Sequence, residues 1–137
     1  MVNTNKKIFF VFIMLIIILL IAFIFLNSSK KETIHLVESD EFEKIITNPD
    51  VFVLNTHTPY EGEIESTDFI AEDWQNIEKY KENLPEDKST PIAVYCRSGR
   101  MSESAAQQLE SLGYKKIYDL KGGMNAWKES GKKIIVN

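Results

Sequence analysis

The 137-residue chain contains one cysteine, two arginines and four prolines. A single cysteine excludes an internal disulfide and a cysteine-rich metal site. It also leaves no second thiol in the chain to resolve an oxidised or sulfur-loaded cysteine, so an outside molecule would have to discharge such a product. Apart from one long apolar run near its start, the chain shows no internal repeat and no low-complexity stretch.

Acidic residues are absent from the first part of the chain and abundant in the rest. Residues 1–31 contain four lysines and no acid, so residues 32–137 carry 12 basic residues against 20 acidic ones. An acidic domain repels nucleic-acid phosphates, and we therefore expect no nucleic-acid partner. The spacing of Glu61, Glu63, Glu65 and Asp68 matches no dedicated calcium loop. We interpret these acids as a solvated loop and expect no metal site.

The long apolar run predicts a membrane anchor. Ile8–Leu26 is 19 residues without a charge. As a helix it would reach about 28 Å, close to a hydrocarbon core of roughly 30 Å. A cleaved signal peptide is the alternative, but the run is longer than such a segment usually is, and no small residue stands at the −3 position of the candidate cleavage sites near Ser28. We predict an uncleaved anchor in residues 1–31, with the span at 8–26.

The charges beside the run give the orientation. Two lysines precede it, Lys6 and Lys7, and two follow it, Lys30 and Lys31. The free amino terminus adds one charge to the short side, and positive charge favours the cytoplasm. We therefore expect a single-pass protein of the cell membrane, with the domain of residues 32–137 on the extracytoplasmic side.

Strand and helix patterns alternate through residues 32–137. Apolar runs predict strands over 34–37, 51–54, 92–96 and 116–120, with a short strand at 68–70 in a long loop. Helical spacing predicts helices over 39–48 (capped by Ser39), 72–84, 102–112 and 124–130. This alternation predicts an α/β fold with a mainly parallel central sheet of about four to five strands and helices on both faces.

The cysteine stands where a thiolate is most easily stabilised. Cys96 ends the strand at 92–96, and the chain's two arginines, Arg97 and Arg100, follow within four positions. In a loop that opens into a helix, backbone N–H groups and guanidinium charge both favour the anionic thiolate. A buried structural cysteine is the alternative. The coincidence with both arginines and with Gly99 favours a nucleophilic or sulfur-carrying cysteine.

A second polar segment should meet this loop. Asn55, Thr56 and His57 follow the strand at 51–54, and the carboxyl ends of parallel strands meet at one edge of a sheet. We therefore expect His57 to lie near Cys96. It could accept a proton or orient a substrate there. The alternative is a structural histidine that makes loop hydrogen bonds.

At this point the sequence resembles a single rhodanese-like domain over about residues 33–135. The resemblance rests on Val94–Ser102, on Ala105, Ala106 and Leu109, on Leu112–Tyr114, on Ile117–Leu120, and on Gly122, Gly123, Trp127 and Gly131. It implies that Cys96 takes a sulfane sulfur from a donor such as thiosulfate or a persulfide and passes it to a thiol or cyanide acceptor. It requires no cofactor. The implied anion-binding loop consists of Arg97, Ser98, Gly99, Arg100, Met101 and Ser102.

Three positions depart from the family's usual pattern. Asn55-Thr56-His57 stands where many members have Asp-x-Arg, Gly62-Glu63-Ile64 where they have Gly-His-Ile, and Met101 where they often have Arg or Thr. A non-catalytic binding or sulfide/redox-sensing module is therefore the alternative function. A cysteine phosphatase or arsenate reductase would need an arginine six residues after the cysteine, where this chain has Ser102.

Overall fold

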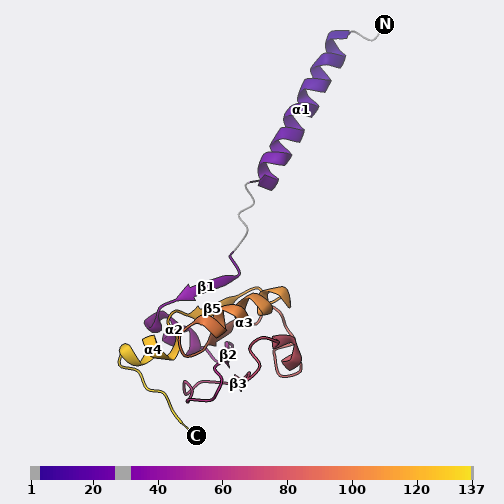
Figure 1. The fold of residues 1–137 in the computed structure, drawn as a ribbon. Helices are drawn as coiled ribbons and strands as arrows, with labels where there is room; N and C mark the ends of the chain where they lie inside the picture. The colour runs from indigo at the N-terminus through magenta and orange to yellow at the C-terminus, as the bar shows by residue number, and fades with distance from the viewer. Residues whose placement is uncertain (1–3, 27–31, 137) are drawn as a thin grey trace. The chain divides into compact units, whose positions relative to one another are not determined.

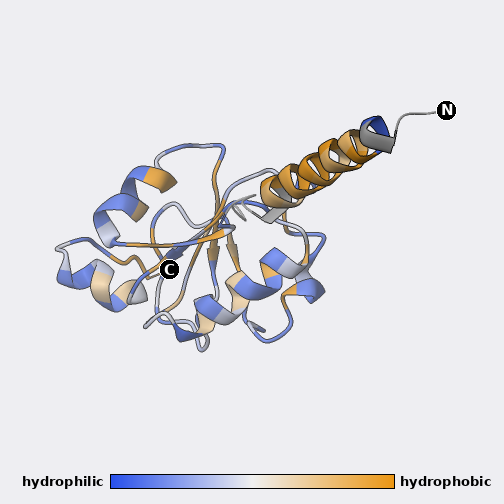
Figure 2. Ribbon diagram, turned by 90° about the horizontal axis from the view of Figure 1, so that it is seen from above, coloured by the Kyte–Doolittle hydropathy of each residue, from blue (hydrophilic) through white to orange (hydrophobic). Residues whose placement is uncertain are grey.

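The computed structural model describes residues 4–26 and 32–136, and the chain divides into two units, Met1–Lys31 and Glu32–Asn137. The first unit contains a single helix of 23 residues, α1 (Thr4–Leu26). Its segment Lys6–Ile24 is long and apolar enough to cross a membrane, on length and composition. Figure 2 shows the hydrophobic colour along nearly the whole of this helix. The flanking residues 27–31 of the predicted anchor lie outside the described residues.

The second unit is built on a five-stranded sheet in which every strand pair is parallel (Figure 1). The strand order is β1-β5-β4-β2-β3. This arrangement confirms the predicted α/β fold, including the short strand in the long loop. The strands are β1 (Ile34–Val37), β2 (Phe52–Asn55), β3 (Phe69–Ile70), β4 (Ile92–Tyr95) and β5 (Ile117–Leu120).

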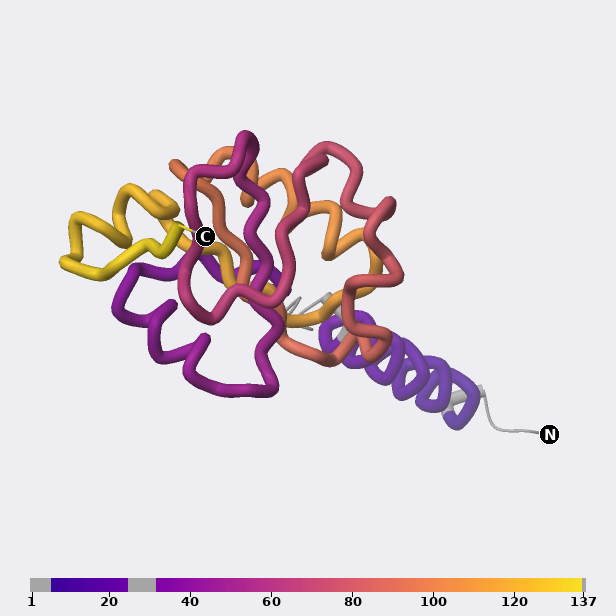
Figure 3. Tube along the Cα trace, turned by 90° about the horizontal axis from the view of Figure 1, so that it is seen from below, coloured from indigo at the N-terminus to yellow at the C-terminus, as the bar shows by residue number. Residues whose placement is uncertain are grey.

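Helices cover both faces of the sheet, as the sequence predicts. On one face, α3 (Arg100–Ser111) and the 3₁₀ turn η1 (Ile77–Tyr80) enclose a core that includes Val94 and Leu109. On the other, α2 (Ser39–Ile46) and α4 (Gly123–Glu129) enclose a second core. Figure 3 shows α4 and the C-terminal segment, in yellow, beside α2, in purple. The Phe42 and Trp127 rings join these two helices, with centroids 6.2 Å apart.

The predicted helix over 72–84 is wrong, because only Ile77–Tyr80 forms a helical turn. The side chain of Gln108 on α3 makes hydrogen bonds in place of those that a helix would form within the segment. Its Oε1 accepts the Ile77 N–H at 2.9 Å, and its Nε2 donates to the Trp74 carbonyl at 2.8 Å. These tertiary contacts satisfy backbone groups that a helix would otherwise pair. Apolar residues of this segment therefore pack against the core without a continuous helix.

The predicted cap of α2 is also wrong. Glu38 occupies the N-cap position with an extended backbone, and no side chain caps the helix. Ser39 is instead the first helical residue and is buried. The acids Asp40 and Glu41 in the first turn compensate the positive end of the helix.

Candidate active site

Cys96 follows β4 directly, at the carboxyl edge of the sheet. β4 lies between β5 and β2, and β2 leads into the segment with His57. Cys96 and His57 line the same small pocket of about 170 Å³, together with Arg97, Ser98, Arg100 and Met101. The Thr56 N–H and hydroxyl both donate to the Tyr95 carbonyl, at 2.9 and 3.1 Å. These bonds join the two loops, so the predicted neighbourhood of His57 and Cys96 is confirmed.

The Cys96 sulfur faces the start of α3. The Gly99 N–H donates to Sγ at 3.1 Å. Gly99 is the N-cap residue of α3 and has a φ of 99°. A residue with a side chain rarely adopts this conformation, so glycine is favoured at this position. Among the described residues, the amides of Arg97, Ser98, Arg100 and Met101 find no acceptor, so they remain available to an anion.

The carbonyl groups of the same loop are bound by the start of α4. The Met124 N–H donates to the Cys96 carbonyl at 2.8 Å, and the Asn125 N–H donates to the Arg97 carbonyl at 3.0 Å. Gly123 permits this approach, because a Cβ at that position would overlap the backbone of Cys96 and Arg97. With these carbonyls engaged, the loop presents hydrogen-bond donors, not acceptors, to its pocket. Such a lining favours an anionic ligand.

The Glu61 carboxylate stands between Arg97 and His57 at the mouth of the pocket. Glu61 lies 3.0 Å from Arg97 through Oε1 and Nη1, and 3.2 Å from His57 through Oε2 and Nε2. The contact with His57 has the distance of an ion pair without hydrogen-bond alignment, and neither ring nitrogen of His57 has a hydrogen-bond partner among the described residues. His57 is only 4% exposed. A buried ring whose nitrogens have no hydrogen-bond partner can bond a ligand or a reacting group.

Asn55 has a structural part in this site. Its Oδ1 accepts the His57 N–H at 2.9 Å, and its Nδ2 donates to the Gly62 carbonyl at 3.2 Å. The side chain is fully buried. Asn55 thus fixes the turn that brings His57 and Glu61 to the pocket.

Below the site, the hydroxyl of Tyr95 accepts the Ile64 N–H at 2.9 Å and bonds the hydroxyl of Thr67. Burial raises the pKa of Tyr95 to about 12. This tyrosine therefore stays neutral, and it links β4 to the long loop between β2 and β3.

The structure brings together most of the predicted site residues, but not all. Ser102 does not line the pocket; it is fully buried, and its hydroxyl donates to the Gly99 carbonyl at 3.0 Å. Arg100 lies over the Trp74 ring at 5.9 Å, at the edge of the pocket. Glu61 was missed by sequence reasoning, which placed it in a solvated acidic loop. The signal that could have identified it is its spacing four residues after His57.

The geometry defines a parallel α/β domain with an anion-accepting loop around a cysteine. A family model described as Rhodanese-like domain matches residues 38–130. The chain belongs to the rhodanese-like domain family. A rhodanese-related protein from Thermoplasma volcanium has the same fold, with a TM-score of 0.63 at 24% identity over 75% of this chain and 99% of that one.

Two curated relatives have different names. A tRNA uridine(34) hydroxylase of Pelagibacter ubique is 31% identical over 103 residues, which is 72% of this chain and 33% of that protein. The thiosulfate sulfurtransferase GlpE of Coxiella burnetii is 42% identical over 52 residues, which is 38% of this chain and 47% of that protein. The chain thus spans about a third of the first and about half of the second. Membership of this family supports an activity of the sulfurtransferase type.

Proposed function

We propose that this protein is a membrane-anchored sulfurtransferase in which Cys96 carries a sulfane sulfur as a persulfide. The observation that carries the proposal is the Cys96 pocket, where Gly99 donates to Sγ and four further amides lack an acceptor among the described residues. The relative GlpE is named a thiosulfate sulfurtransferase, which fits this chemistry. The hydroxylase relative matches over a third of its length, and this acidic domain suits a small sulfur compound better than tRNA.

In the loading step, the Cys96 thiolate attacks the outer sulfur of thiosulfate. The new bond joins Sγ to that sulfur, the sulfur–sulfur bond of thiosulfate breaks, and sulfite leaves with the electron pair. Arg97 and Arg100 at the pocket attract the dianionic donor, and the free loop amides stabilise the charge on the outer sulfur of the persulfide.

In the discharge step, a thiolate or cyanide attacks the outer sulfur. The bond between that sulfur and Sγ breaks, and Cys96 leaves as a thiolate while the acceptor departs as a persulfide or thiocyanate. His57 lies in the pocket without a hydrogen-bond partner and can take the proton of an acceptor thiol.

We further propose that α1 anchors the protein as a single membrane span, with residues 32–137 outside the cytoplasm. The length and composition of Lys6–Ile24 support this arrangement, as does the charge balance beside it. Protease added to intact cells should cut the domain. Cleavage seen only after permeabilisation would place the domain in the cytoplasm.

The direct test of transferase chemistry is intact-mass analysis of the full chain in detergent after incubation with thiosulfate. We expect a gain of about 32 Da, the mass of one sulfur atom, that cyanide removes with release of thiocyanate. Cys96→Ser should keep the unfolding midpoint and gain no mass. Absence of the adduct on a folded wild-type protein, with every sulfane donor tried, would leave the non-catalytic module as the better interpretation.

A further inference from the structure

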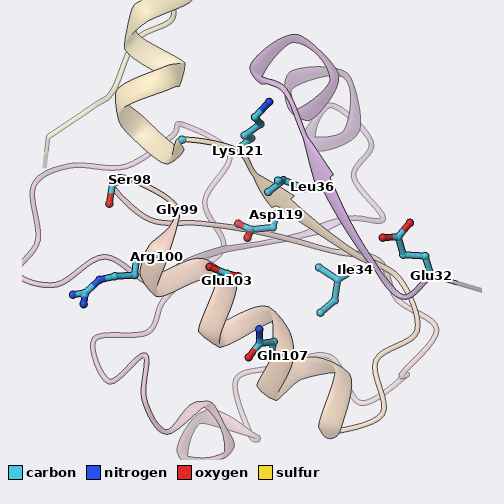
Figure 4. A pocket seen from close by; sticks show the side chains of 11 residues that line it. Glu32, Ile34, Leu36, Ser98, Gly99, Arg100, Glu103, Gln107, Asp119 and Lys121 are labelled. Carbon is cyan, nitrogen blue, oxygen red and sulfur yellow. The ribbon is translucent and has the colours of Figure 1, made fainter.

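A second pocket lies on the α3 face of the sheet and adjoins the Cys96 pocket, with which it shares Ser98 and Arg100. It has a volume of about 610 Å³ and opens between the edge strand β1 and helix α3, over β5 (Figure 4). Its strand side is Ile34 and Leu36 of β1 with Asp119 of β5, and its helix side includes Glu103 and Gln107. Cys96 is not among its lining residues. Leu36 is 63% exposed.

Asp119 is the unusual residue of this pocket. Its side chain is 2% exposed, and its Oδ1 is buried without a hydrogen-bond partner among the described residues. A buried acceptor that is left unpaired costs free energy, and native proteins pair nearly all of them. Burial raises the pKa of Asp119 to about 6, the charge of Glu103 adds to that rise, and the Ser102 hydroxyl opposes it. Oδ1 of Asp119 thus lacks a hydrogen-bond donor among the described residues.

The charged neighbours do not supply that donor. Lys121 lines the pocket, but its Nζ is 2.6 Å from Glu38 Oε1. Arg100 also lines it, and its guanidinium lies over the Trp74 ring. Within residues 4–26 and 32–136, no ion pair involves Glu103 or Asp119. The two carboxyl groups therefore face the same cavity with no cation between them.

We propose that this pocket binds a small organic molecule that carries a primary ammonium group and a short aliphatic portion. The ammonium group donates to Asp119 and lies within the field of Glu103, while the aliphatic portion covers Ile34 and Leu36. An ammonium group has three donors and a full charge, so it satisfies the unpaired Oδ1 and relieves the repulsion between the two acids. Within the described residues, no group of three or more metal-ligating side chains comes together, which favours an organic cation over a metal ion.

The test uses the full chain in a neutral detergent, with the methyl groups of Ile34 and Leu36 observed by NMR. n-Butylammonium chloride should shift these methyl signals saturably at pH 7.5, and n-butanol should bind at least tenfold more weakly. Asp119→Asn should weaken n-butylammonium binding at least tenfold, and Glu103→Gln should weaken it severalfold. The matched variant Asp50→Asn changes an exposed carboxylate outside the pocket and should leave the affinity unchanged.

Binding should also weaken as the pH falls from 7.5 to 5, because protonation removes the charge that the ammonium group pairs with. The other charged groups at the pocket are Glu32 before β1, Arg100 and Glu103 on α3, and Lys121 after β5. The proposal is overturned by equal binding of n-butanol and n-butylammonium, by undiminished binding to Asp119→Asn, or by the same shifts with Mg²⁺ at equal concentration. Cys96→Ser should bind normally, so failure of the transferase proposal and failure of this one are distinguishable.

Discussion

The Met124 amide lies 2.8 Å from the carbonyl oxygen of Cys96 and donates a hydrogen bond to it. This bond joins the first residues of α4 to the loop at the end of β4. The Cys96 and Arg97 carbonyls therefore face away from the anion that the loop is built to accept. The Gly122-Gly123 pair is thus part of the site, because it lets α4 begin against the backbone of the cysteine loop.

Gly123→Ala should damage both the site and the fold. The new Cβ would overlap the Cys96 carbonyl, and the φ of 57° is unfavourable for alanine. We expect a loss of about 1–3 kcal/mol in the free energy of unfolding, and slower persulfide formation at Cys96. Denaturant unfolding and intact mass measure the two effects. Gly131→Ala is the matched control, because its φ is also positive, at 83°, but nothing lies within 4 Å of the added atom. Equal losses in both variants would contradict the steric argument.

Glu61→Gln should strengthen the binding of an anionic sulfur donor. The carboxylate neutralises Arg97 at the mouth of the pocket. An exposed ion pair is worth about 0.2–1 kcal/mol, so we expect KM for thiosulfate to fall by about 1.4- to fivefold, with a smaller change at high salt. Steady-state kinetics at low and high salt measure this change in KM. Glu65→Gln removes an acid from the same loop and should leave KM unchanged. A rise in KM for Glu61→Gln would indicate that the carboxylate positions Arg97 and does not merely screen it.

His57→Gln should slow the discharge of the persulfide to a thiol by about a hundredfold, the lower end of what a positioned proton-transfer group contributes. Cyanide carries no such proton when it attacks as the anion, so discharge to cyanide should change less. Rapid-quench measurements of the two acceptors separate these cases. His35→Gln changes the other histidine, which stacks on Tyr118 with ring centroids 5.5 Å apart, and should leave both rates intact. Equal slowing with both acceptors would remove the proton-transfer role.

Asp119→Asn should change how stability depends on pH. The folded-state pKa of Asp119 is raised from 3.8 to about 6, so between these values the folded protein binds more protons than the unfolded chain. The free energy of unfolding contributed by this group therefore falls as the pH rises from about 4 to about 6.5, by at most about 3 kcal/mol. Relative to the wild type, Asp119→Asn should gain stability across this range. Thermal unfolding at several pH values measures the difference, and a constant difference would contradict the raised pKa.

Much of the fold follows from periodicity in the sequence. The runs Ile34–Val37, Ile92–Tyr95 and Ile117–Leu120 are short and mainly apolar, and each is a strand in the sheet. The segment over 72–84 could not be predicted in this way, because its backbone partners come from Gln108, more than 20 residues away along the chain. Local spacing carries no information on such a contact.

The site could be predicted only in part, because some of its contacts depend on tertiary structure and not on local spacing. Cys96 and its loop are contiguous, and topology alone brings His57 to them. Glu61 approaches Arg97 only because Asn55 fixes the intervening turn. Asp119 occupies a core-facing strand position, so an acid in an otherwise apolar run was the available signal for the second pocket.

The depth of Cys96 sets a size limit on any reagent that reaches it. The residue is 1% exposed and lies in a space of about 170 Å³. A narrow molecule such as cyanide or a slender thiol can enter that space, whereas a folded protein can reach the sulfur only by extending a thin arm. Selectivity of this kind depends first on the width of the reagent, and only then on recognition of its chemical groups.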